Sequence, residues 1–206
     1  MNLKAILDVI NAVREYLFSY KKITNKFDKI DNIESLKLFI QERSAYITQT
    51  TLYGYLKTRM GLKFTLMFSD EIFLQSVNKS KWHIFGEAVS DMTLFAMSFL
   101  YNNKKIQHIN TKNFYDEILQ KEGLNGMPNE VINICKSNFE KKLTNFDLKE
   151  HINQKEPFKD SCLSLYKWSP IAEELKVLDK EIVLNSMRNK WNLILKDLKI
   201  SIENFK

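Results

Sequence analysis

Glycine and proline are scarce in this chain, and that scarcity limits the folds open to it. Five glycines and three prolines are spread over 206 residues. β-Sandwiches and β-barrels need many tight turns, and tight turns depend on these two residue types. Hydrophobic residues make up 44% of the chain, and its length allows one sizeable core. The sequence therefore predicts an all-α, single-domain bundle of six to eight helices, with a long central helix and a long C-terminal helix.

The first thirty residues have an amphipathic pattern followed by a charged linker. Apolar side chains recur there at steps of three and four, which places them on one face of a helix. The opposite face is mixed in sign, which favours a protein contact over a membrane surface. We interpret residues 1–30 as a helix and linker that could detach from a bundle domain at 31–206. The candidate interface on this first helix comprises Leu3, Ile6, Ile10, Val13 and Leu17.

The stretch ERSAYITQTTLYGYLKTRMG belongs to a predicted central helix running from about Ile33 to Met60. Asp31 or Asn32 is positioned to cap its start, and Gly61 follows its end. Apolar or aromatic side chains occupy most of its sides, which is typical of a helix surrounded by others. A second long helix is predicted over residues 70–101, and an interruption near 78–81 is left open.

Two carboxylates, Glu87 and Asp91, fall on a face of this second helix that is otherwise apolar. A buried carboxylate without a partner is costly. We predict that Arg43 pairs with one of them and that Tyr46 or Tyr53 completes the hydrogen bonds. Two interpretations stay open: a purely architectural pair, or the lining of a pocket for a small polar or lipid-like ligand. The candidate residues are Arg43, Tyr46, Thr50, Tyr53, Glu87 and Asp91.

Shorter helices are predicted in the C-terminal half of the chain. One runs from Thr111 to Glu122, and another starts near Pro128. In WSPIAEEL, Ser169 is predicted to cap a terminal helix that begins at Pro170 and extends nearly to the chain end. Tryptophan and arginine are frequent at interface hot spots, but core and rim packing would explain them equally well here. The residues concerned are Trp168, Asn185, Arg188 and Trp191.

The sequence lacks the motifs of the common enzyme and metal classes. There is no G-x-S-x-G nucleophile elbow, no E-x-x-H pair for a di-metal bundle, no C-x-x-C and no glycine-rich phosphate loop. We interpret His83, His108 and His151 as surface or loop residues, and Cys135 and Cys162 as reduced core residues. No catalytic residue, metal or cofactor is therefore predicted.

The charge balance is basic, with a formal net charge of +6. Arginine, the side chain best suited to phosphate and base contacts, occurs only four times, so nucleic-acid binding is not expected. The N-terminus lacks a signal-peptide layout. The most apolar stretch, residues 93–101, is about half of the ~20 residues that a membrane-spanning helix needs. We expect a cytoplasmic protein without a transmembrane segment; peripheral membrane contact and homo-oligomers stay open.

Three stretches carry a resemblance to a known group of proteins: the tyrosine-rich stretch above, MFSDEIFLQSVNKSKWHIF and WSPIAEELKVLDKEIVLNSMRNKW. Over residues 34 to 203 the chain resembles an uncharacterised, all-helical family widespread in alphaproteobacteria. Some members carry an automatic "esterase" label, but the family has no established activity to transfer. The missing nucleophile elbow argues against that label here.

These observations favour an interaction protein over an enzyme. The leading hypothesis is a helical adaptor or accessory subunit that binds another protein through its N-terminal or its C-terminal helix. The alternative is a ligand-binding or hydrolytic bundle around Arg43, Glu87 and Asp91. Peripheral membrane attachment through the first helix is a minor third hypothesis.

Overall fold

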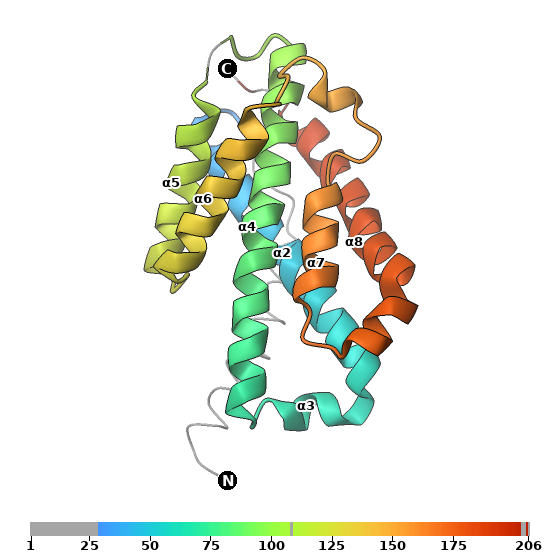
Figure 1. The fold of residues 1–206 in the computed structure, drawn as a ribbon. Coiled ribbons are helices and arrows are strands. Elements are labelled where there is room, and N and C mark those ends of the chain that lie inside the picture. Colours follow the sequence, from blue (N-terminus) through green and yellow to red (C-terminus); the bar gives the residue numbers. More distant parts are fainter. Residues whose placement is uncertain (1–28, 108, 203–204, 206) are drawn as a thin grey trace.

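The computed structural model describes residues 29–107, 109–202 and 205 (Figure 1). This part of the chain contains helices and no strand, so the predicted all-α bundle with long central and C-terminal helices is confirmed. The predicted first helix, with Leu3, Ile6, Ile10, Val13 and Leu17, lies outside the described residues. The elements are α2 (Ile33–Met60), η1 (Gly61–Lys63), α3 (Phe64–Met67), α4 (Glu71–Asn102), α5 (Thr111–Leu124), α6 (Asn129–Leu143), η2 (His151–Asn153), α7 (Lys159–Trp168) and α8 (Glu173–Ser201).

Local hydrogen bonds set the ends of α2 where the sequence predicted them. Asn32 accepts the N–H of Ser35 at 2.8 Å, and the Ser35 hydroxyl accepts the N–H of Asn32 at 3.1 Å, forming a capping box. Gly61 follows the last turn with a φ of +55°, a left-handed value that suits glycine. In front of this helix, the buried Ile30 donates its N–H to the carbonyl of Ser201 at 2.9 Å.

The helix α4 runs without interruption through the middle of the bundle. Asp70 caps its start by accepting the N–H groups of Ile72 and Phe73. Residues 78–81 remain helical, because none of them lacks an N–H group or clashes with the preceding turn. From Ile84 to Leu100 every residue except Glu87 and Phe99 is buried. Figure 1 shows the reason: α4 packs against α2, α5, α6 and α7.

A close approach of α4 and α6 occurs at Gly86. A Cβ atom at this position would overlap Sγ of Cys135, so the absence of a side chain lets the two helices meet. The hydroxyl of Tyr115 on α5 donates to the Gly86 carbonyl at 3.0 Å. Cys135 and Cys162 are buried and free, as predicted.

The start of α8 differs from the prediction. Ser169 does not cap α8; it ends α7, and its hydroxyl donates to the carbonyl of Leu165 at 2.6 Å. The reason is Pro170, which disfavours the helical conformation at the residue before it and leaves Ser169 at a ψ of 127°. The helix begins only at Glu173, although Glu173 and Glu174 do occupy its first turn, as predicted. It packs against α7 and α2 at one edge of the bundle (Figure 1).

Within the described ranges, no helix is both long enough and apolar enough to cross a bilayer.

Candidate functional site

The most concentrated set of charges surrounds Lys142 near the end of α6. Its ammonium lies 2.7 Å from Glu87, 3.2 Å from Asp91 and 2.8 Å from Asp160, and 3.1 Å from the hydroxyl of Ser90. We name Lys142, Glu87, Asp91 and Asp160 the Lys142 cluster. Because its members come from α4, α6 and α7, the cluster joins three helices.

Burial dominates the protonation behaviour of Asp91. Its side chain is 3% exposed, and burial raises its pKa to about 6, against the Lys142 charge and the N–H of Ser161. That N–H, in the first turn of α7, donates to Asp91 at 2.8 Å. Burial alone would lower the pKa of Lys142, but attraction to the carboxylates raises it above its ordinary value. At Asp91 burial outweighs attraction, and the like charges of Asp160 and Glu87 beside it raise the pKa further.

The same three carboxylates have the chemistry of a ligand set for a hard cation. Their nearest oxygens all lie within 4.8 Å of one another. The Lys142 ammonium lies among them, however, and supplies the positive charge that they need. The arrangement therefore works as a buried ion-pair network, and a metal would have to displace this lysine.

A cavity of about 440 Å³ opens beside this cluster, between α4, α6 and α7. One wall is a stack of His83 on Trp168, with ring centres 3.7 Å apart and planes 2° from parallel. The ammonium groups of Lys79 and Lys167 lie 5.5 and 5.4 Å from the Trp168 ring centre. Burial, followed by these two lysine charges, lowers the pKa of His83. The side of the cavity is thus a neutral imidazole stacked on an indole, with cations around it.

The side chains of this cavity are poorly suited to nucleophilic catalysis. Ser164 donates to the main-chain carbonyl of His83 at 3.3 Å rather than to its ring. Burial raises the pKa of Cys135 to about 12, which keeps it a thiol at neutral pH.

The prediction that the histidines are surface or loop residues is wrong for His83 and His151, which are both buried. His108 lies outside the described residues.

The predicted pairing of Arg43 is wrong. Its guanidinium, 3% exposed, pairs with Asp197 of α8 at 3.2 Å and lies 5.4 Å from the Phe39 ring centre. The carboxylates of α4 bind Lys142 instead. Helical periodicity placed Glu87 and Asp91 on a buried face, but it could not say which neighbouring helix that face meets.

The three remaining residues of the predicted pocket do not join this site. The ring centre of Tyr46 lies 6.0 Å from the ammonium of Lys190. Thr50 donates within its own helix, to the Tyr46 carbonyl at 2.8 Å. Tyr53 is buried, with its ring 6.3 Å from that of Phe68. The six predicted residues are therefore distributed over several contacts rather than gathered around one pocket.

The predicted C-terminal interface residues also separate. Trp191 is 1% exposed, stacks on Phe158 at 4.3 Å and donates its indole N–H to Ser161 at 3.1 Å. Of the two roles considered for Trp191, an interface contact or core packing, these contacts fit core packing. Arg188 pairs with Glu156 at 2.5 Å and also bonds to Asn185, while Trp168 forms the cavity wall.

Sequence reasoning missed two sets of contacts. Lys142 is three residues after Phe139 and seven after Cys135, so it shares their buried face, and that spacing was the available signal. The second set joins α2 to α8. Tyr55 donates to Asp179 at 2.8 Å, and Arg59 binds both oxygens of the same carboxylate. Burial, then the bond to Asp179, raises the pKa of Tyr55 to about 12.

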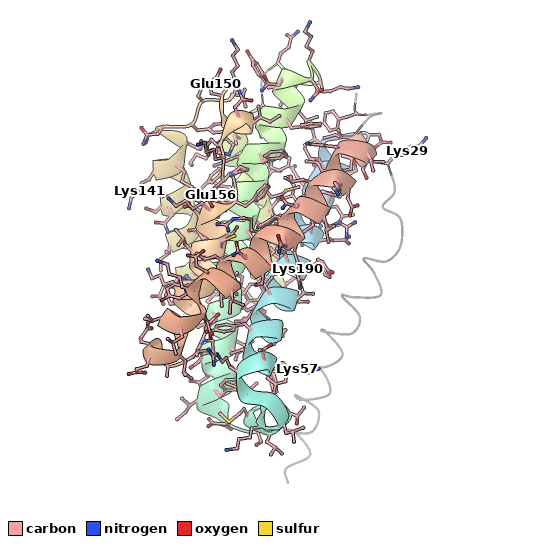
Figure 2. All side chains as sticks on the ribbon, turned by 90° about the vertical axis from the view of Figure 1, so that its right-hand side faces the viewer. Lys29, Lys57, Lys141, Glu150, Glu156 and Lys190 are labelled. Carbon is pink, nitrogen blue, oxygen red and sulfur yellow. The ribbon has the colours of Figure 1, made fainter. Side chains whose placement is uncertain are left out.

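The outward side of α8 carries a row of exposed apolar side chains, which we name the α8 stripe. At 100° per residue they fall within a sector of about 60° of the helix. They are between 40% and 74% exposed, and they lie opposite the buried face that contains Met187 and Trp191. Figure 2 looks onto this side, with α8 crossing in front of the other helices. The stripe comprises Leu175, Leu178, Ile182, Leu193 and Ile200.

Comparisons with known protein families, with curated proteins and with solved structures found no match to this chain.

Proposed function

We propose that the protein is a helical adaptor or accessory subunit that binds a protein partner through the α8 stripe. The observation that carries this proposal is the stripe itself: five large apolar side chains, each at least 40% exposed, aligned along one helix. Single exposed apolar residues are ordinary on protein surfaces, but a set aligned on one face of a helix over several turns is typical of an interaction site. A helix face of this kind fits a groove or another helix.

The way α8 is held supports this role. Its inward face is fixed by the ion pair of Asp197 with Arg43, by the bonds of Asp179 to Tyr55 and Arg59, and by buried Trp191. A helix anchored along its length loses little conformational freedom when a partner binds its outer face. The stripe is therefore presented on a rigid element, which favours recognition.

Affinity purification from native cells with a matched set of variants tests this function. The wild-type chain, Ile182→Glu/Leu193→Glu and Val177→Glu would be used as baits and compared by quantitative mass spectrometry. Val177 is 66% exposed on the same helix but lies away from the stripe, so its variant controls for added charge. We expect a partner that is retained by the wild type and Val177→Glu and lost from the stripe variant. Identical profiles for all three baits would refute the proposal.

A second candidate function, binding of a small anion, rests on the cavity beside the Lys142 cluster. Its volume falls within the range of about 300 to 1,000 Å³ that is usual for ligand sites. Lys141 and Lys167 line it together with the Trp168 indole, a combination that suits a planar, negatively charged molecule, and the two carboxylates of the lining, Glu87 and Asp160, are paired with Lys142. The candidate site for the ligand-binding alternative is therefore this cavity rather than the surroundings of Arg43.

Benzoate and inorganic phosphate are suitable probes for the cavity. Titration of each would be followed by the NMR signal of the Trp168 indole N–H. Saturable shifts with benzoate that are weakened by Lys167→Ala would support the site. Equal, linear responses in both proteins would rule it out.

A further inference from the structure

Glu122 carries a buried carboxylate that has no cation beside it. Its side chain is 8% exposed and forms no ion pair with a lysine, arginine or histidine of the described ranges. The hydrogen bond that it does form comes from the side-chain amide of Gln41, which donates to Oε1. Glu122 also lies in the last turn of α5, where the helix carbonyls add partial negative charge. A buried carboxylate in such a place needs positive charge from another source.

A cavity of about 260 Å³ opens beside this carboxylate, between α2, α4 and α5. Its apolar wall consists of Ala45, Trp82 and Phe85, and the two rings meet edge to face with their centres 6.1 Å apart. Thr48 lines it too; this residue is 1% exposed, and its hydroxyl has no hydrogen-bond partner among the residues that the structure describes. Buried polar groups are nearly always bonded, so Glu122 and Thr48 both leave room for a partner from outside the chain.

The cavity also contains groups that suit an anion. Lys81 lines it, and its ammonium lies 4.5 Å from the Trp82 ring centre. Within the described part of the chain this ammonium has no acidic partner, so Lys81 and Glu122 do not neutralise each other. Asn125, directly after α5, adds a side-chain amide. One small cavity thus combines an unpaired carboxylate, an unpaired ammonium and two aromatic rings.

We propose that this cavity, which we name the Glu122 cavity, binds a free α-amino acid with an apolar side chain. The ligand ammonium pairs with Glu122, and the ligand carboxylate pairs with Lys81 and the Asn125 amide. The ligand side chain packs on Trp82 and Phe85. An amino acid compensates both protein charges at once, whereas a simple amine or acid leaves one of them unpaired.

The size of the Glu122 cavity fits this ligand class. Its volume lies just below the range of about 300 to 1,000 Å³ that is usual for larger organic ligands. The inference goes beyond the proposed function, because the cavity contains no residue of the α8 stripe and none of the cavity beside the Lys142 cluster. Its failure would leave the adaptor proposal unaffected.

Titration of the purified full-length chain with three amino acids tests the inference first. L-Valine, L-leucine and L-phenylalanine would each be added to protein labelled with ¹⁵N at tryptophan, and NMR would follow the indole N–H signals. At least one amino acid should shift the Trp82 signal saturably, with a Kd below about 1 mM. The signal of Trp191, which stacks on Phe158 in the core, should not move. The absence of a saturable shift with all three overturns the inference.

Analogues of the best amino acid test the need for both charges. For leucine, isoamylamine lacks only the carboxylate and isocaproate lacks only the ammonium; corresponding pairs exist for valine and phenylalanine. Each analogue should bind at least tenfold more weakly than the amino acid, because it leaves one protein charge unpaired. An amine or an acid that binds as tightly as the amino acid contradicts the inference.

Glu122→Gln tests the carboxylate itself. The amide keeps the shape and can still accept from Gln41, and circular dichroism would establish that the variant is equally helical. Amino-acid binding should be at least tenfold weaker in Glu122→Gln and in Lys81→Met. It should be unchanged in Glu117→Gln, which alters an exposed glutamate of the same helix. Equal affinity in Glu122→Gln and the wild type would refute the proposed site.

Melting temperatures separate ligand binding from a structural role. Without ligand, Glu122→Gln should melt at or above the temperature of the wild type, because a buried charge without compensation is removed. Lys81→Met should melt nearly as the wild type does. Added amino acid should raise the melting temperature of the wild type but not of Glu122→Gln. If both variants melt lower to a similar extent without ligand, the two side chains pair with each other in solution and the inference fails.

Discussion

The ammonium of Lys142 lies 3.2 Å from Oδ1 of Asp91, a carboxylate that also accepts the N–H of Ser161 at the start of α7. This pair joins α6, α4 and α7 at one point, next to the cavity and beneath the surface.

Lys142→Met should destabilise the fold strongly. The substitution removes the only cation that lies within 4 Å of Asp91 among the described residues and leaves buried negative charge without compensation. Breaking a buried pair from one side typically costs about 3–5 kcal/mol, which chemical unfolding would measure. The matched control is Lys141→Met, at the exposed neighbouring position, which should change the free energy of unfolding by less than about 0.5 kcal/mol.

Asp91 should make stability fall as pH rises from about 4 to about 6. Its pKa is about 6 in the folded protein, against roughly 3.9 in an unfolded chain, so the folded state binds the proton more tightly in this window. The stabilisation is complete below pH ~4 and is lost as pH rises through ~6. Lys142, Glu87 and Asp160 all face this carboxyl; Lys142 and the N–H of Ser161 oppose its protonation, and the two carboxylates favour it.

Asp91→Asn provides the reference for this pH effect, because the amide keeps the shape and does not titrate. The difference in unfolding free energy between wild type and variant should change by up to about 3 kcal/mol across the window, at 1.36 kcal/mol per pH unit. Urea unfolding at several pH values would measure it. A difference that stays constant between pH 4 and 7 would show that Asp91 is ionised throughout.

Tyr55→Phe should weaken the attachment of α8 to α2. The lost hydrogen bond to Asp179 should lower the free energy of unfolding by about 1 kcal/mol. Spectrophotometric titration of the wild type should show a tyrosine ionising near pH 12, and this component should be missing from the variant. Tyr101→Phe, at an exposed position, serves as the control and should leave stability nearly unchanged.

Gly86→Ala and Gly54→Ala should have opposite effects, although both glycines lie inside long helices. At Gly86 a methyl group would overlap Cys135, so α4 and α6 must separate at a cost of about 1–3 kcal/mol. At Gly54 nothing lies within 4 Å of the added atom, and alanine should stabilise the helix by about 0.5–1 kcal/mol. Thermal unfolding would show whether each substitution lowers or raises the melting temperature. Pairing Gly86→Ala with Cys135→Ala should recover part of the loss.

Sequence reasoning succeeded where a structural signal is local. The caps Asn32 and Gly61 bond to residues within a few positions, so their pattern is visible in the chain itself. It failed at Ser169, where a favourable cap residue was overruled by the proline next to it.

The candidate sites were harder to predict because their residues are distant in sequence. Arg43 and Asp197 are separated by more than 150 positions, and periodicity alone does not identify which helices meet. The α8 stripe could not be recognised either, since apolar residues occur on both sides of this helix. Val183 and Leu184 are buried while the adjacent Ile182 is exposed, and only the packed structure distinguishes them.

The hydrogen bond from Ile30 to Ser201 has a consequence for synthesis on the ribosome. It closes the described part of the bundle across 171 residues, and the bonds of Tyr55 and Arg59 to Asp179 span 124 and 120 residues. Contacts of such high sequence separation form late and slow folding. A nascent chain can assemble α4 with α5 and α6 as they emerge, but α2 keeps one side open to chaperones until translation of α8 is complete.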